Sequence, residues 1–598
     1  MQLLWALYDL ISQSILLIII VPLTLPCLAG GIPGLIERLR RRRLEEALPE
    51  VLESISTSIG AGLGLQQALS EVARTRRDET GRLLALAIER SRATSFDAAL
   101  AVAATETVTI IPSCGVGGDS FVLLHEAATG KVTGVNSSGI APSGATGEYY
   151  RSQGYATMPL EGPHSISVPG EVAAWEMIHQ NFCTLPLAQL LAPAENYARE
   201  GFPVPPGIGR NLANGVSKLS QFPSTASVLL PNGRPPNEGD ILVNAGLART
   251  LQRIAAGGAD AFYRGELTRE MVAALRSAGG LFTEDDFAGH YAEVYDPLST
   301  MYRGHTVYQT RPPSQGFLLL EMLNMVEGFD LASLGPNSAE SIHLMAEAKK
   351  IAYSDRNRLA GDPKFVEWPL DQLISKDYAA RRRSEIDPTR AASELPAIEP
   401  VKAGGDTTYF CVADGDGNCV SWIHSLSNAF GSGFIAGDTG VLFNNRAGRG
   451  FSLEENHPNE IEPGKRTMHT LNCYLTTKDG QPAIVGGTPG GDFQPQSGLQ
   501  ILTNLIDYGM DPQEAVEAPR WWSFPGTDPE SLDTPMELRV EAGMPEAAIQ
   551  GLEKLGHKIA RRRPGTHDGK VQLILLDRER GILKGASDPR GDGHAAAW

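Results

Sequence analysis

The sequence has few cysteines and no excess of positive charge. Its six cysteines lie far apart without a CxxC pair, and its 12 histidines include no HExxH motif. The sequence therefore indicates neither a zinc site nor a disulfide framework, and we expect neither a metal nor another cofactor. Acidic residues outnumber basic ones by 70 to 52, which gives a net charge of −18. A nucleic-acid partner requires a basic surface and is therefore not expected.

Length and composition indicate a globular protein with several domains. A chain of 598 residues is too long for one hydrophobic core, so we expect two to four domains. The content of 42% hydrophobic and 20% charged residues is typical of folded proteins and gives no reason to predict disorder.

The most apolar stretch of the chain, residues 10–35, is long enough to cross a membrane. Pro22 and Pro26 would kink it, and the arginines at 38 and 40–43 follow it, whereas no Lys or Arg precedes it. This order differs from that of a signal peptide, and the positive-inside rule places the rest of the chain in the cytoplasm. We therefore predict a transmembrane segment over residues 1–36; the alternative is a buried hairpin of two short helices.

Residues 37–90 are predicted to be helical. Apolar residues recur at helical spacing, at positions 48, 52, 55, 59, 65, 69 and 72. The stretches 48–55 and 62–69 resemble the helical repeat of type II secretion F and tight-adherence membrane proteins. That resemblance implies a membrane-embedded scaffold placed ahead of a second unit.

A predicted hairpin organises the C-terminal half. Residues 405–412 and 418–425 form two β-prone runs joined by the turn 414–417, whose Asp-Gly pairs favour a hairpin. A Pro- and Gly-containing linker, residues 394–405, leads directly into Thr407. This arrangement is typical of an N-terminal-nucleophile hydrolase, in which a self-cleaved Thr supplies both the hydroxyl nucleophile and an α-amine base. The alternative is an ordinary β-branched start of a strand.

Several Gly- and Pro-rich motifs follow one another in a fixed order. They include Ile111–Ser120, Ala141-Pro142, Ser167–Gly170, Gly257–Gly265, Gly279–Phe287, Arg311–Gly316, Asp355-Arg356 and Ala586–Gly593. In this order they resemble the γ-glutamyltransferase family over residues 95–598. The resemblance implies an α+β, four-layer αββα sandwich of the N-terminal-nucleophile type. It also implies cleavage between Asp406 and Thr407 into a large subunit, 95–406, and a small catalytic subunit, 407–598, that stay packed together.

The same resemblance assigns the catalytic groups. Thr407 corresponds to the nucleophile, Ser425 to the hydroxyl residue that hydrogen-bonds it, and Gly490 and Gly491 to the oxyanion-binding turn. The implied activity is amide hydrolysis or acyl transfer from glutathione or another γ-glutamyl amide. An ester on Thr407 would be released to water or to an amine acceptor.

The positions expected to line the substrate site are Ser138, Ser427, Asn445, Arg446, His469 and Thr470. Ser138, Arg446, His469 and Thr470 depart from the family pattern. Ser138 replaces the arginine that grips the γ-glutamyl carboxylate, and Arg446 stands where the amine-binding loop should carry acidic and amide groups. This pattern is similar to a divergent branch of oxamate amidohydrolase-like and acylase-like members, which predicts a small carboxylated amide as an alternative substrate. Arg446 could instead be a solvated loop residue.

The sequence allows a second function and a second location. The chain could be a membrane-anchored, secretion-related scaffold whose transferase-like part is inactive. Its location is also open, because the arginine run predicts a membrane-associated protein with a cytoplasmic catalytic part, whereas the family is commonly exported.

Overall fold

A computed structural model describes residues 93–359, 361–392, 406–525, 536–563 and 569–597, with residues 51, 54, 72 and 74–76. The chain divides into two compact units, Thr94–Ala595 and Met1–Ala93 with Ala596–Trp598. The predicted membrane segment, nearly all of the predicted helical segment 37–90, and the linker 394–405 lie outside the described residues. Within the described ranges, no helix is both long and apolar enough to cross a membrane.

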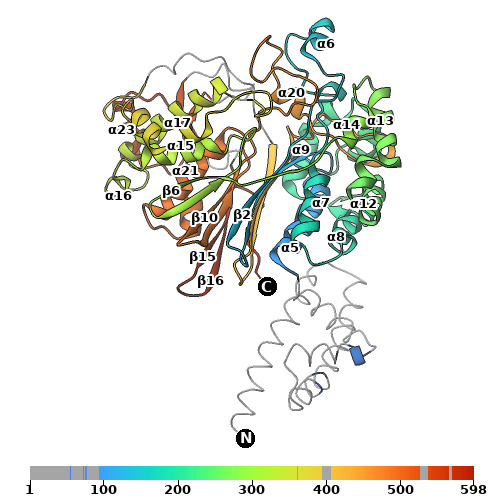
Figure 1. The fold of residues 1–598 in the computed structure, drawn as a ribbon, viewed down its shortest axis with the longest axis horizontal. Coiled ribbons are helices and arrows are strands. Elements are labelled where there is room, and N and C mark those ends of the chain that lie inside the picture. The colour runs from blue at the N-terminus through green and yellow to red at the C-terminus, as the bar shows by residue number, and fades with distance from the viewer. Residues whose placement is uncertain are drawn as a thin grey trace. The chain divides into compact units, whose positions relative to one another are not determined.

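Two antiparallel sheets form the centre of the larger unit (Figure 1). The first has the strand order β5-β2-β1-β9-β8 and the second the order β16-β15-β11-β10-β7-β6. The strands of the first sheet are β1 Asp119–Glu126, β2 Lys131–Ser137, β5 Glu293–Tyr295, β8 Asp406–Ala413 and β9 Cys419–Ser427. Those of the second are β6 Leu298–Tyr302, β7 His305–Gln309, β10 Cys473–Lys478, β11 Gln481–Gly487, β15 Gln572–Asp577 and β16 Ile582–Ser587.

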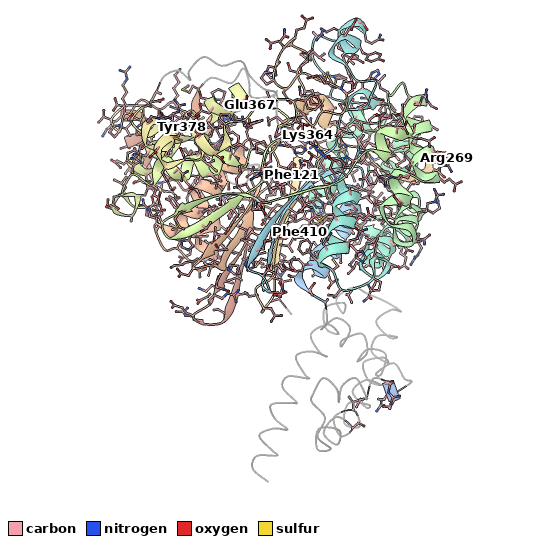
Figure 2. The ribbon with its side chains drawn as sticks, in the orientation of Figure 1. Phe121, Arg269, Lys364, Glu367, Tyr378 and Phe410 are labelled. Atoms are coloured by element: carbon pink, nitrogen blue, oxygen red, sulfur yellow. The ribbon has the colours of Figure 1, made fainter. Side chains whose placement is uncertain are left out.

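The two sheets pack face to face through an apolar layer. Phe121, Tyr409 and Ile423 of the first sheet meet Leu475 and Val485 of the second in this layer. Because side chains alternate along a strand, the neighbouring positions face the opposite side. Phe410, for example, belongs to the core beneath the helices of the first sheet, and Figure 2 labels it together with Phe121.

Helices cover the outer side of each sheet, which gives the predicted αββα order of layers (Figure 1). On the first sheet lie α5 Ser95–Thr109, α7 Glu171–Phe182, α8 Leu187–Glu200 and α12 Ala245–Tyr263. On the second lie α15 Phe317–Val326, α17 Ala339–Leu359, α21 Phe493–Ile506 and α23 Glu546–Lys554. The Ala-rich helix α5 begins at Ser95, where Thr94 and Asp97 form a capping box.

Shorter elements complete the unit. The further helices are α6 Gly147–Ser152, α9 Pro206–Asn214, α10 Val216–Leu219, α11 Pro223–Leu229, α13 Glu266–Ser277, α14 Glu284–Ala288, α16 Leu331–Leu334, α18 Leu370–Leu373, α19 Lys376–Arg383, α20 Arg446–Gly450 and α22 Pro512–Glu517, with 3-10 turns η1 Pro163–Ser165, η2 Pro231–Gly233 and η3 Gly437–Thr439. Two small sheets contain β3 Phe202–Pro203 with β4 Ile241–Leu242, and β12 Trp521–Phe524 with β13 Glu537–Glu541 and β14 Ile559–Arg562.

The predicted hairpin is present as β8 and β9. The Asp414 carboxylate accepts the backbone N–H groups of Asp416, Gly417 and Asn418 and so fixes the turn. Gly417 has a φ of +100°, a conformation that favours glycine. This turn sets the register that brings Thr407 opposite the end of β9.

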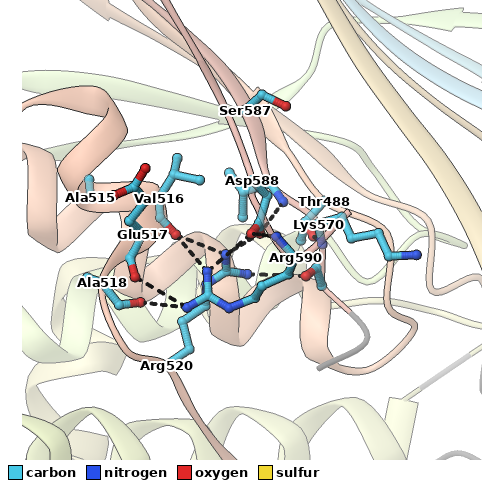
Figure 3. A network of polar contacts seen from close by, with 12 residues as sticks. Thr488, Ala515, Val516, Glu517, Ala518, Arg520, Lys570, Ser587, Asp588 and Arg590 are labelled. Atoms are coloured by element: carbon cyan, nitrogen blue, oxygen red, sulfur yellow. Dashed lines mark hydrogen bonds and ion pairs between the residues drawn. The ribbon is translucent and has the colours of Figure 1, made fainter. Parts of the chain in front are cut away.

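A buried ion pair fixes the end of the chain against α22 (Figure 3). The Arg520 guanidinium donates to Asp588, and Arg590 donates to the other oxygen of the same carboxylate at 3.1 Å. Nearby, the Lys570 N–H donates to the hydroxyl of Thr488 at 2.8 Å. Thr488 immediately follows β11, so this cluster also supports the start of the glycine turn described below.

Candidate active site

Thr407 lies opposite an irregularity in the β8–β9 pairing. Asp406 pairs with Ser427 and Thr408 pairs with His424, so both Ser425 and Leu426 lie opposite Thr407. Such a β-bulge changes the direction of a side chain at the end of a sheet. The buried Thr407 hydroxyl donates to the Ser425 hydroxyl at 3.3 Å. The structure therefore brings together the two hydroxyl groups that the sequence pairs.

The Ser425 hydroxyl is fixed from its own strand. Its Oγ accepts the backbone N–H of Ser427 at 2.7 Å. Ser427 has a φ of +86°, which is rare for a residue with a side chain and marks a local distortion of the strand end. The Ser425 oxygen is thus held in place before any substrate binds.

The glycine turn after β11 lies at the same end of the inter-sheet layer as Thr407. Tyr409, two residues beyond Thr407, has its side chain on the same face of β8. Its ring occupies the space into which a Cβ on Gly487, the last residue of β11, would project. Gly490 and Gly491 follow with φ values of +121° and +54°, so both positions favour glycine.

A buried network fixes this turn. The Gln315 amide donates to the carbonyl oxygens of Gly491 at 3.0 Å and Thr470 at 2.9 Å. Arg356 donates to the Gln315 side-chain oxygen and, at 2.6 Å, to the carboxylate of Asp492. The network therefore connects the turn to the segment that carries His469 and Thr470.

Asp119 anchors a second cluster beside Ser425. It is the first residue of β1 and pairs with Ser425 in the sheet. Its Oδ2 accepts from Arg446 Nε and from His469 Nε2, both at 3.2 Å, and its Oδ1 accepts the Gly139 N–H at 2.9 Å. Arg446 opens α20 and is only 2% exposed, so the interpretation of a solvated loop residue is wrong.

The charge states in this cluster follow from burial and proximity. Burial alone would raise the pKa of Asp119, but the His469 hydrogen bond and the charges of His469 and Arg446 outweigh it and lower the pKa. Burial, followed by the charge of Arg446, lowers the pKa of His469 to about 4. Burial also lowers the pKa of Arg446 to about 10. At neutral pH the cluster therefore contains a carboxylate, a guanidinium and a neutral imidazole.

Four of the six predicted substrate residues, and Asn428 beside Ser427, carry a buried polar atom without a partner among the described residues. Among the described residues, no hydrogen-bond partner is found for Ser427 Oγ, Asn428 Oδ1, Arg446 Nη2, His469 Nδ1 and Thr470 Oγ1. A buried polar atom without a partner costs about 1–3 kcal/mol, so a group of them at one place is typical of a site that binds a polar ligand.

Two predicted substrate residues have their polar atoms engaged within the chain. The Ser138 hydroxyl donates to Asn136 Oδ1 at 2.7 Å. The Asn445 amide donates to the Leu160 carbonyl at 2.8 Å and accepts the Asn428 N–H at 3.0 Å. In this arrangement both side chains support neighbouring loops.

Sequence reasoning missed Asp119, Gln315 and Arg356. Asp119 directly follows the glycines of Ile111–Ser120, Gln315 lies within Arg311–Gly316, and Arg356 is part of Asp355-Arg356. A charged or amide residue within such a motif is the signal that could have identified them.

Two groups of side chains have the composition of metal ligands. In the group Glu106, Cys114 and His424, the imidazole nitrogens already face Glu106 at 2.8 Å and Glu171 at 3.0 Å. In the other group, His343, Glu347 and His557, the two rings hydrogen-bond each other at 2.9 Å and Lys350 pairs with Glu347 at 2.6 Å. Protein groups thus already satisfy the potential ligand atoms.

The chain is similar to several known proteins over most of its length. A family model described as gamma-glutamyltranspeptidase matches residues 84–598. The glutathione hydrolase-like YwrD proenzyme of Bacillus subtilis is 41% identical over 507 residues, 84% of this chain and 93% of that protein. The oxamate amidohydrolase proenzyme of Klebsiella pneumoniae is 31% identical over 520 residues, 86% and 96% of the two chains. A crystal structure of cephalosporin acylase from Bacillus halodurans superimposes with a TM-score of 0.79 at 36% identity, covering 86% of this chain and 92% of that one.

Proposed function

This chain belongs to the γ-glutamyltranspeptidase family of N-terminal-nucleophile amidohydrolases, and on that premise we propose that Thr407 is its nucleophile, freed by cleavage of the Asp406–Thr407 bond. The observation that carries the proposal is the contact between the Thr407 and Ser425 hydroxyls opposite the bulge. The proenzyme names of the relatives support processing into a large subunit ending at Asp406 and a small subunit beginning at Thr407.

Self-cleavage would begin within the chain. The Thr407 hydroxyl attacks the carbonyl carbon of Asp406, and the C–N bond between the two residues breaks. The hydroxyl proton passes to the departing nitrogen, and an ester forms between the two residues. Water then hydrolyses the ester. This leaves a new α-carboxylate on Asp406 and a Thr407 with a free hydroxyl and a free α-amine.

Turnover would use the groups that cleavage exposes. The α-amine, with an ordinary pKa of about 8, accepts the Thr407 hydroxyl proton as the oxygen attacks a substrate amide. The N–H groups of Gly490 and Gly491 stabilise the resulting oxyanion, a contact often worth about 3 kcal/mol of barrier. The amine product departs with the proton, and water or an amine acceptor then takes the acyl group from Thr407.

Two substrate classes are candidates. Glutathione and other γ-glutamyl amides are the first, supported by the family model and by relatives named glutathione hydrolases. A small carboxylated amide is the second, supported by the buried Arg446 cluster and by the relative named oxamate amidohydrolase.

The test combines processing with turnover. Purified wild-type protein is analysed on a denaturing gel and assayed for glutamate release from glutathione and ammonia release from oxamate. We expect two fragments and turnover of at least one substrate, whereas Thr407→Ala remains one chain and is inactive. A wild-type protein that stays uncut and inert towards both substrates would instead support the inactive-scaffold alternative.

A further inference from the structure

The guanidinium of Arg446 is only partly used by the protein. Asp119 accepts from its Nε at 3.2 Å, whereas no partner among the described residues is found for Nη2. The side chain is nearly fully buried. A guanidinium presents its N–H groups as a planar fork that matches a carboxylate, and a buried nitrogen left unpaired is costly.

The neighbours of Arg446 place its guanidinium on the same face of the first sheet as Thr407. Asp119 and Ser425 are directly paired on adjacent strands, so their side chains lie on the same face of the sheet. Thr407 contacts Ser425 on that face, and Asp119 fixes Arg446 there. His469, which bonds the same carboxylate oxygen, packs its ring 4.9 Å from that of Phe121, also on this face.

We infer that Arg446 binds a carboxylate on the acyl part of the substrate, so that the preferred substrates are monoamides of dicarboxylic acids that lack an α-ammonium group. This inference rests on the proposed function, because it places the carboxylate next to a Thr407 that forms the acyl ester. Asp119 acts as the positioning residue that aims the guanidinium.

The electrostatics of the cluster oppose an ammonium group. His469 Nε2 must carry the proton that binds the Asp119 carboxylate, and its lowered pKa keeps the ring neutral, so the positive charge beside Asp119 is that of Arg446. After burial, the charge of Arg446 is the largest factor that lowers the pKa of His469. A field that disfavours a positive charge on His469 disfavours a substrate ammonium at the same place.

Neighbouring hydroxyls complete the site. Ser427 Oγ and Thr470 Oγ1 are buried, have no partner among the described residues and can donate to a carboxylate. Arg449, on the same short helix, donates to the Ser427 carbonyl at 2.9 Å and brings a second guanidinium close to this position. These donors match an anionic acyl group better than a zwitterionic one.

Matched substrate pairs test this inference with the wild-type protein. Glutaramate and L-glutamine differ only in the α-amino group, as do succinamate and L-asparagine. Ammonia release gives kcat/KM for each compound, and titration calorimetry compares glutarate with L-glutamate as products. We expect the amine-free member of a pair to have a kcat/KM at least about tenfold higher, and glutarate to bind more tightly than glutamate.

Variants locate the effect at Arg446. Arg446→Lys keeps the charge but loses the fork, so kcat/KM for the amine-free member should fall about 10- to 100-fold. Arg520→Lys is the matched control, because Arg520 forms a comparable buried pair with Asp588 outside the cluster (Figure 3). This control is expected to lower stability without changing the ratio within each pair.

The possible failures are distinguishable. Equal or faster turnover of glutamine, or an Arg446→Lys variant with unchanged selectivity, would overturn the inference while leaving the amidase function intact. A cut enzyme that hydrolyses none of the four amides and binds no glutarate would overturn it as well. A chain that remains uncut and inert towards every amide would instead refute the proposed function.

Discussion

A threonine hydroxyl is a weak nucleophile, so its immediate neighbours decide whether it can react. Ser425 lies 3.3 Å from the Thr407 hydroxyl and is itself fixed by the Ser427 N–H. A fixed oxygen at this distance orients the nucleophile and can stabilise charge on it. The proposed chemistry therefore depends on the strand distortion at Ser427 as well as on the hydroxyl of Thr407.

Removal of the Ser425 hydroxyl should slow catalysis. A hydrogen bond to a charged group contributes about 1.5–3 kcal/mol, so Ser425→Ala is expected to lower kcat about 10- to 100-fold with little change in KM. Steady-state kinetics of the processed enzyme measure this. Ser421→Ala, a buried serine on the same strand that bonds Tyr409, is the control that should keep kcat. Equal losses in both variants would show a general packing defect instead.

At the residue scale, the sequence indicated the proposed reacting groups more directly than it indicated their surroundings. Thr407, Ser425 and the two turn glycines lie in local motifs that can be read directly from the chain. The pair of Asp119 and Arg446 joins residues 327 positions apart, and no local pattern indicates such a contact. Burial of Arg446 likewise depends on the packing of α20, which its polar composition does not suggest.

At the scale of elements, the glycine turn is positioned by side chains from α17 and from the segment that precedes α15. Gln315 precedes α15, and Arg356 lies on α17, yet both bond groups within or next to the turn. Positive φ values let the two glycines adopt the turn, and the network determines how far it can move. The expected oxyanion site is therefore a joint property of β11 and two helices.

Disruption of this network should reduce the rate more than substrate binding. Gln315→Met leaves two buried carbonyls without their donor and frees the turn, so kcat is expected to fall about 10- to 100-fold. Gln500→Met is the matched control, because Gln500 is a buried glutamine that bonds the Gln496 and Trp521 carbonyls away from the turn. A larger loss of kcat in the control than in Gln315→Met would contradict this role.

Lys349 on α17 makes the stability of this element depend on pH. Its Nζ donates to the Pro525 carbonyl at 2.9 Å and lies 4.4 Å from the ring centroid of Tyr353, whose hydroxyl donates to the Asp492 carbonyl. Burial lowers the pKa of Lys349 from 10.5 to about 7. Between these values the unfolded chain binds more protons than the folded one, so stability rises with pH across this window.

Replacement of Lys349 by an uncharged residue should remove this pH dependence. Lys349→Met carries no cost of burying a charge, so its stability relative to wild type should improve as pH falls from about 10 to about 7. Urea unfolding of both proteins at the two pH values measures the change. A stability difference that is the same at both values would show that the Lys349 pKa is not lowered.

At the scale of the whole molecule, the sequence predicted the αββα order of layers and the hairpin that contains Thr407. The two β-prone runs joined by an Asp-Gly turn predicted the hairpin, and the family resemblance implied the two-sheet sandwich. The strand order within each sheet could not be deduced from local patterns. In the first sheet, for example, β1 lies between β2 and β9. It depends on the pairing of strands that are far apart in the chain.

The larger compact unit should be able to act without the N-terminal segment. Every proposed site residue lies within Thr94–Ala595, and the family match begins at residue 84. A chain that begins at residue 84 is therefore expected to cut itself and to keep kcat within roughly twofold. The predicted membrane segment further implies that the full-length chain sediments with membranes while the shortened chain does not. An uncut shortened chain would contradict the first expectation, and a full-length chain left in the supernatant would contradict the second.

The most direct measurement is the intact mass of the purified protein under denaturing conditions. Two masses are expected, and the smaller fragment should begin at Thr407 and end at Trp598. Thr407→Ala should give one mass for the uncut chain. A wild-type protein that hydrolyses amides as a single uncut chain, or that is cut at another bond while Thr407 remains internal, would contradict the assignment of Thr407 as the nucleophile.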